Sequence, residues 1–114
     1  MSERMRRVNS VLREVIADEV EDLKDPRLGF VTITGVDTAP NLRRATVYYS
    51  VLGTPEVAAS TQAALDAAAP RVSRVIGGQV RMKYTPTLSF VVDDAIVRAS
   101  RIGEALRKIH DEEE

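Results

Sequence analysis

Apolar residues recur at every third or fourth position over residues 3–23, which is the spacing of one face of an α-helix. The positions are Met5, Val8, Leu12, Val15, Ile16, Val20 and Leu23. The pattern stops at residues 24–29 (KDPRLG), where Asp25 precedes a proline and Gly29 permits a turn. Because a residue before proline avoids the helical conformation, we expect the first helix to end here.

Three stretches alternate between apolar and polar positions, as strands with one buried face do. Residues 30–36 (FVTITGV) and 43–52 (RRATVYYSVL) flank the turn-forming DTAPN, which predicts a hairpin. The third alternation runs through Val80, Met82, Tyr84, Pro86, Leu88, Phe90 and Val92. It predicts one long, bent strand over residues 80–92. Because Pro86 cannot donate to a strand ladder, we place this strand at a sheet edge.

A helical pattern with an internal proline lies between the hairpin and the third alternation. Thr54 and Pro55 suit the N-cap and the first helical position. The apolar positions are Val57, Thr61, Ala64, Leu65, Ala68, Val72, Val75 and Ile76, and their phase does not slip at Pro70. Two separate helices would not need to share one phase, so we predict one helix that is kinked at Pro70 and ends at Gly77 and Gly78. The residues assigned to the kink are Ala68, Ala69 and Pro70.

These elements make a single α+β domain over residues 1–110, with helices on one face of a three-stranded sheet. Residues 95–109 carry a weaker helical pattern and predict an extra C-terminal helix. The acidic residues 111–114 (DEEE) are expected to be a disordered tail. The predicted order is therefore α-β-β-α-kink-α-β-α.

The formal net charge of −1 hides an uneven distribution of charge. The first helix is rich in acidic residues, whereas residues 71–83 contain four bases and no acid. Such a chain can present one attractive face to a polyanion despite a near-neutral total. There is no apolar run of membrane-spanning length and no signal-peptide pattern, so we expect a cytoplasmic protein with no membrane contact.

Residues suited to catalysis are scarce. There is no cysteine, and the single histidine, His110, adjoins the acidic tail. Asp93 and Asp94 are better explained as a strand end or a helix cap than as a catalytic pair. No phosphate-binding glycine loop or metal-ligand spacing occurs. We therefore expect no enzyme activity, no cofactor and no metal site.

The element order is that of a type II KH domain, whose GxxG loop between two helices clamps nucleic acid. Four motifs are spread over nearly the whole length of the chain: Arg4-x-x-Arg7-Val8, Lys24-Asp25-Pro26-Arg27-Leu28, Ala45-x-Val47-Tyr48 and Arg81-x-Lys83-x-x-Pro86-x-Leu88-x-Phe90-x-x-Asp93. Through these motifs the sequence resembles the ribosome-binding factor A family of bacterial small-subunit assembly factors. The KDPRL motif is expected to act mainly in the structure, by closing the first helix.

The resemblance implies a KH-like fold in which an Ala-x-Gly kink replaces GxxG. Here Pro70 stands where the family has glycine, and the family's arginine after the kink aligns with Ser73, next to Arg74. The resemblance further implies a non-catalytic monomer that binds the free small (30S) ribosomal subunit and its 16S rRNA. Its role would be late maturation and 16S rRNA processing, with the greatest need in the cold and alongside assembly GTPases.

Six bases are predicted to contact rRNA phosphates, because they share helix faces or strand sides within basic segments or the matching motifs. They are Arg4, Arg7, Arg71, Arg74, Arg81 and Lys83. One alternative is a protein-interaction module that uses an exposed sheet edge without direct RNA contact. Another is a small hydrolase of ferredoxin-like shape, which would need an anion-binding loop that the sequence does not show.

Overall fold

Two helices and three strands make up residues 2–93, the part of the chain that the computed structural model describes. Their order is α1 (Glu3–Asp22), β1 (Phe30–Thr38), β2 (Arg44–Leu52), α2 (Pro55–Gln79) and β3 (Thr87–Val92). With α2 taken as the two helical segments on either side of Pro70, this matches the α-β-β-α-kink-α-β order expected for a KH-like α+β domain. The helix expected over residues 95–109 and the acidic tail at 111–114 lie outside the described residues.

Helix α1 begins and ends close to where its apolar pattern does. The Ser2 hydroxyl accepts a hydrogen bond from the Met5 N–H at 3.2 Å, which satisfies one of the free donors of the first turn. The buried residues follow one stripe and are Asn9, Leu12, Ile16 and Val20. Leu23 has extended backbone angles, so the helix stops just before KDPRLG as predicted.

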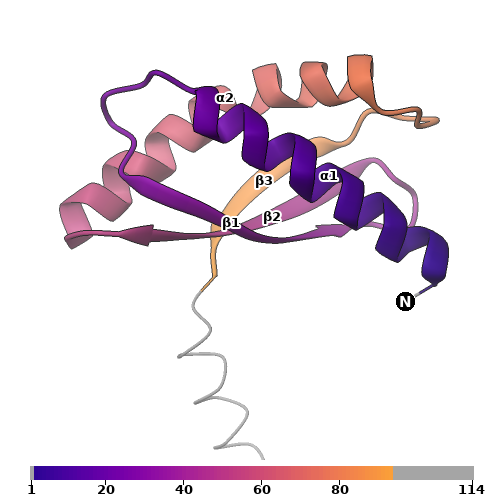
Figure 1. Cartoon of the computed structure of the whole chain (residues 1–114), viewed down its shortest axis with the longest axis horizontal. Helices are drawn as coiled ribbons and strands as arrows, with labels where there is room; N and C mark the ends of the chain where they lie inside the picture. The colour runs from indigo at the N-terminus through magenta and orange to yellow at the C-terminus, as the bar shows by residue number, and fades with distance from the viewer. Residues whose placement is uncertain (1, 94–114) are drawn as a thin grey trace, which may run out of the picture.

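The sheet has the strand order β1-β2-β3 (Figure 1). The predicted hairpin is present, with β1 and β2 antiparallel and Phe30 opposite Leu52, and β1 continues to Thr38. A register irregularity lies between Ile33 and Gly35. Strand β3 is parallel to β2, so the chain must cross over between them, and α2 makes that crossover.

The prediction of one long strand over residues 80–92 is wrong, because the ladder begins only at Thr87. Thr87 pairs with Arg44, the first residue of β2. Before Arg44 the neighbouring chain turns: the Leu42 N–H bonds the Ala39 carbonyl at 2.8 Å, and Leu42 has a φ of 62°. Residues 80–86 therefore have no strand to pair with.

The alternation in residues 80–86 has a different cause. Val80 and Met82 pack against the core and Pro86 is buried, although none of these residues belongs to a strand. The alternation thus reflects a segment that packs on the core without a hydrogen-bonded ladder, and the chain bends at Lys83 and Tyr84. Tyr84 is the exception, because it is 36% exposed and does not face the core.

Helix α2 runs without interruption from Pro55 to Gln79, with Pro70 inside it, as its constant phase predicts. The Thr54 hydroxyl caps it by accepting a hydrogen bond from the Val57 N–H at 3.3 Å. The axis of α2 changes direction along its length (Figure 1). Gly77 lies within the last turn instead of ending the helix, so the predicted end is slightly early.

Both helices cover the same face of the sheet (Figure 1), which confirms the predicted layer arrangement. The core lies between that face of the sheet and the apolar faces of the two helices. On β2 the buried residues are Ala45, Val47 and Tyr49, and on α2 the largest are Leu65, Val72 and Ile76. Burying each large aliphatic side chain contributes about 1.5–3 kcal/mol. The helices are thereby held firmly against the sheet.

Candidate nucleic-acid interface

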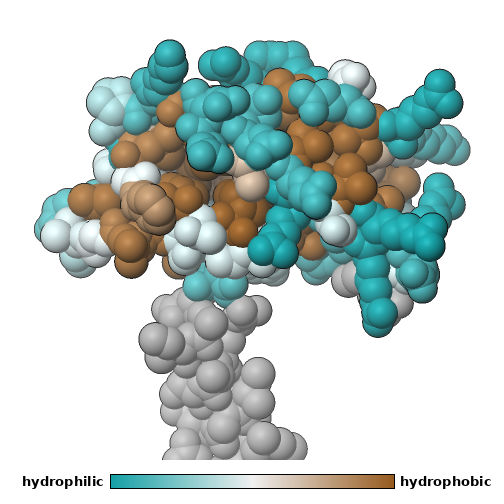
Figure 2. All heavy atoms as spheres, viewed as in Figure 1, coloured by the Kyte–Doolittle hydropathy of each residue, from teal (hydrophilic) through white to brown (hydrophobic). Residues whose placement is uncertain are grey.

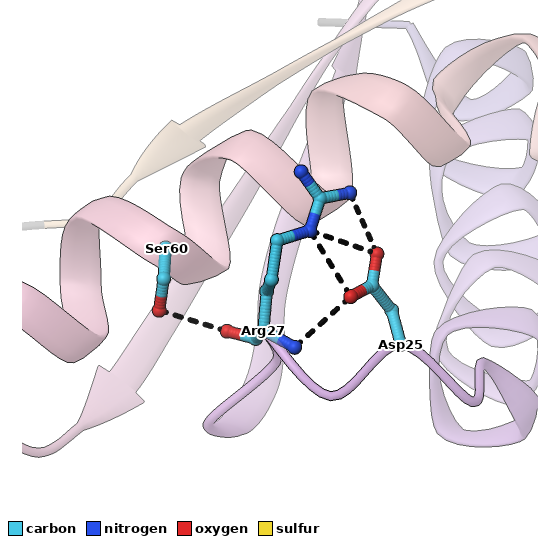
Figure 3. A network of polar contacts seen from close by, with 3 residues as sticks. All are labelled: Asp25, Arg27 and Ser60. Carbon is cyan, nitrogen blue, oxygen red and sulfur yellow. Dashed lines mark hydrogen bonds and ion pairs between the residues drawn. The ribbon is translucent and has the colours of Figure 1, made fainter.

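The KDPRL motif forms a tight turn in which Asp25 and Arg27 bind each other (Figure 3). The backbone N–H of Arg27 donates to Asp25 Oδ1 at 2.9 Å. The guanidinium Nη2 of Arg27 donates to Asp25 Oδ2 at 2.7 Å. These hydrogen bonds from Arg27 lower the pKa of the Asp25 carboxyl below its usual value. In turn, the hydrogen bond to Asp25 raises the pKa of the Arg27 guanidinium. The charges of the motif are therefore fixed in position relative to each other.

This turn is also tied to α2. The Ser60 hydroxyl donates to the Arg27 carbonyl at 2.9 Å (Figure 3). Two residues later in the turn, the Gly29 N–H donates to the Thr61 hydroxyl at 2.9 Å. A Cβ on Gly29 would lie only 2.6 Å from a methyl of Val57, so this close approach requires glycine. The motif therefore sets how the end of α1 meets the first half of α2.

A surface hollow of ≈ 520 Å³ opens where the motif meets the middle of α2. Small side chains of α2 line it, namely Ala64, Ala67 and Ala68. Three bases also line it: Lys24, Arg27 and Arg71. Asp25 offsets one of these charges through its pair with Arg27. The hollow therefore combines a net positive lining with small residues that allow a phosphate group to approach closely.

All six predicted RNA-binding basic residues are exposed, and they come from α1, from α2 and from the segment after α2. Arg71 lines the hollow, whereas Arg81 and Lys83 follow the C-terminal end of α2. Arg4 and Arg7 lie in the first two turns of α1. The start of α1 and the segment after α2 lie toward the same end of the molecule, at the right of Figure 1. Hydrophilic side chains project from that end in Figure 2.

The other contacts of these bases are few. Arg7 lies 3.7 Å from Glu3 in an exposed i,i+4 ion pair. A pair of this kind is worth only about 0–1 kcal/mol and does not hold the arginine back from a stronger partner. Within residues 2–93, Arg71, Arg74 and Arg81 have no hydrogen bond or ion pair. Their guanidinium groups are therefore available to phosphate.

Ser73, which aligns with the family's arginine, and Arg74, the next residue, lie in different surroundings. The Ser73 hydroxyl donates to the Pro86 carbonyl at 2.6 Å, which fastens α2 to the start of β3. Arg74 is exposed. Ser73 thus has an internal partner, and Arg74 is the base that this turn of α2 offers to a ligand.

The structure also brings together two residues that the sequence reasoning did not connect. Arg43 Cζ lies 4.2 Å from the centre of the Tyr84 ring, and Lys83 Nζ lies 5.5 Å from it. Arg43 is not among the six predicted basic residues, and the alternation predicts that Tyr84 lies on the core side of a strand. The only sequence signal is the aromatic residue within the basic stretch RMKY, residues 81–84.

Residues 2–93 contain no group of three or more histidine, cysteine, aspartate or glutamate side chains placed to hold a metal ion. In the same part of the chain, neither helix combines the length and the apolar character that crossing a membrane requires.

The chain is similar to known proteins over almost all of its length. A family model described as ribosome-binding factor A matches residues 4–106. A relative from Rubrobacter xylanophilus, named ribosome-binding factor A, is 44% identical over 113 residues. The alignment covers 96% of this chain and 90% of that protein.

Solved structures of the same description share the architecture. A Thermotoga maritima solution structure, titled a putative ribosome binding factor A, has a TM-score of 0.72 at 30% identity, over 80% of this chain and 88% of that one. A homology model of the Thermus thermophilus ribosome binding factor A, fitted into the cryo-EM map of its complex with the 30S subunit, has a TM-score of 0.62 at 29% identity, over 75% of this chain and 91% of that one. With the fold, the KDPRL turn and these matches in agreement, the chain belongs to the ribosome-binding factor A family.

Proposed function

We propose that this protein is a non-catalytic assembly factor that binds the free small (30S) ribosomal subunit through its 16S rRNA. It would support late maturation and 16S rRNA processing, most of all in the cold, as a cytoplasmic monomer acting on the same subunit as assembly GTPases. The support from outside the chain is the family and the similar homology model of a relative that was fitted into the map of its 30S complex. The support from within it is the arrangement of bases around α2.

The observation that carries the proposal is the run of exposed bases that begins at the hollow and continues past the end of α2. Arg71, Arg74 and Arg81 have no ion pair within residues 2–93, so binding a phosphate would break no existing contact. Folded RNA is recognised largely by shape and by backbone contacts, which suits a rigid surface of this kind. Each phosphate bound releases condensed counterions and makes the affinity dependent on salt.

The test is binding to purified small subunits at several salt concentrations, with large subunits as the specificity control. We expect the triple variant Arg71→Ala, Arg74→Ala, Arg81→Ala to bind at least a hundredfold more weakly and with a shallower salt slope. Arg13→Ala is the matched control, because Arg13 is an exposed arginine on α1 outside the predicted set. If the triple variant and wild type bind equally well, the α2 bases are not the contact surface. If wild type binds both subunits alike or neither, the proposed function is wrong.

A second candidate function is protein binding along β1, which is an outer strand of the sheet. A groove of ≈ 500 Å³ runs between this strand and the end of α1. Its lining includes Val20, Leu28 and Phe30, and Phe30 is 71% exposed. Binding there would depend on apolar contact and strand pairing, so its affinity would change little with salt. The salt titration above therefore separates the two functions.

A further inference from the structure

The contact between Arg43 and Tyr84 lies at the surface, at the point where the loop before β2 meets the segment before β3. The guanidinium carbon is 4.2 Å from the ring centre, well inside the range of a cation–π interaction. Arg43 is exposed and Tyr84 is 36% exposed. The pair therefore presents an aromatic ring and a planar cation to solvent together.

The backbone on the Arg43 side is fixed before any ligand binds. The Arg43 N–H donates to Asn41 Oδ1 at 3.0 Å. Its carbonyl accepts from the Thr87 N–H at 2.9 Å, the bond that starts the parallel ladder. Arg43 is thus held on both sides of its α-carbon by hydrogen bonds that do not involve its side chain.

The backbone on the Tyr84 side is fixed as well. Tyr84 lies two residues before Pro86, which is buried and whose carbonyl accepts the 2.6 Å bond from Ser73. Both members of the pair are therefore mounted on anchored segments, and ordering them costs little when a ligand arrives.

The surroundings of the pair determine which ligand it suits. Residues 39–44 and 80–87, the two segments that meet here, contain four bases and no acid: Arg43, Arg44, Arg81 and Lys83. A partner must therefore carry negative charge as well as a flat, polarisable group. Unpaired nucleobases of RNA stack on aromatic rings and on the planar guanidinium groups of arginines. The RNA phosphates then contact nearby lysine and arginine side chains.

We propose that Tyr84 and Arg43 form a stacking site for one unpaired nucleobase of the rRNA, with Lys83 and Arg81 contacting the adjoining phosphates. This inference rests on the proposed function. It adds a contact to a nucleobase, where the sequence predicts contacts to phosphates alone. Every base has a stacking face, so the site would favour an unpaired nucleotide over a paired one without selecting its identity.

The test uses a short single-stranded RNA that carries one 2-aminopurine, whose fluorescence falls when it stacks. Wild type is expected to quench this signal, and Tyr84→Leu to abolish the quenching and lower the affinity about tenfold. The salt slope should stay the same, because the substitution removes no phosphate contact. Tyr84→Phe is the matched control and should retain both quenching and affinity.

Two further measurements separate stacking from a purely structural role. The melting temperatures of the Leu and Phe variants should match, and Arg43→Lys, which keeps the charge but loses the planar group, should weaken quenching. Quenching by Tyr84→Leu at the wild-type level would overturn the inference. If Tyr84→Leu has a lower melting temperature than Tyr84→Phe, the result for Arg43→Lys decides between the two roles. Full quenching by Arg43→Lys would then count against the stacking site. Wild-type binding to small subunits is measured in parallel, so that failure of the stacking site is distinguished from failure of the proposed function.

Discussion

The side chain of Asn9 on α1 accepts a hydrogen bond of 3.0 Å from the backbone N–H of Thr38, the last residue of β1. Both residues are almost fully buried, with exposures of 8% and 4%. A polar residue therefore stands in the apolar stripe of α1 because β1 has a main-chain donor there that β2 does not satisfy. This contact ties the start of α1 to the end of β1.

Asn9→Ala should destabilise the domain by about 1–3 kcal/mol, because it leaves the Thr38 N–H buried without a partner. Chemical denaturation measures this loss directly. The companion variant is Thr38→Val, which removes a buried hydroxyl that has no hydrogen-bond partner within residues 2–93. It should be neutral or slightly stabilising. Equal stability of Asn9→Ala and wild type would show that the hydrogen bond contributes nothing.

Pro70→Ala should stabilise the domain, by up to about 3 kcal/mol, because alanine restores the N–H that proline lacks and removes its clash with the preceding turn. Pro70 is exposed, so the change leaves no cavity in the core. We also expect a straighter α2 and weaker binding to small subunits. Thermal melts and subunit binding measure the two effects.

Pro70→Gly is the comparison variant for the bend. Glycine also restores the N–H but keeps the helix easy to bend, so subunit binding should stay near the wild-type level. If the alanine variant binds as tightly as the glycine variant, the bend has no role in recognition.

The Asp25–Arg27 pair predicts a dependence of stability on pH. Hydrogen bonds from Arg27 lower the pKa of Asp25 below its ordinary value of 3.8. A carboxyl with a lowered pKa stabilises the fold above that ordinary value and loses the contribution as pH falls through the lower, folded-state value. Wild type should therefore melt above Asp25→Asn at neutral pH.

The difference between these two proteins should shrink as the pH falls below about 4, where the unfolded carboxyl becomes protonated. Melting temperatures from pH 7 to pH 2 measure it, with Asp18→Asn on the exposed side of α1 as the control for a general loss of negative charge. A constant difference across this range would mean that the pair does not contribute through its charge.

Ser73 and Arg74 should have separable effects, because one points inward and the other outward. Ser73→Ala removes the hydrogen bond to the Pro86 carbonyl and should cost about 0.5–1.5 kcal/mol of stability, with the salt slope unchanged. Arg74→Ala should leave stability unchanged and lower the slope of log affinity against log salt by roughly 0.7–0.9. The opposite assignment, with a slope change only for Ser73→Ala, would refute this division of roles.

Local patterns in the sequence determined most of the secondary structure. The spacing of three and four along α1, and the constant phase of α2 through Pro70, reflect which side of each helix must be buried. A helix makes its hydrogen bonds within its own segment, so that pattern is enough to predict it. The hairpin was predictable for a related reason, since its two strands are neighbours in the chain and a turn signal separates them.

What only the tertiary structure decided is which distant segments meet. Alternation over residues 80–92 indicates most of the side chains that pack on the core, with Tyr84 and Val92 as exposed exceptions, but a strand also needs a partner, and β2 offers one only from Arg44 onward. The same pairing, through the bond from the Thr87 N–H to the Arg43 carbonyl, brings Tyr84 beside Arg43. Contacts of this kind depend on where the backbone of another element begins or ends. The periodic spacing of apolar residues within one segment does not contain that information.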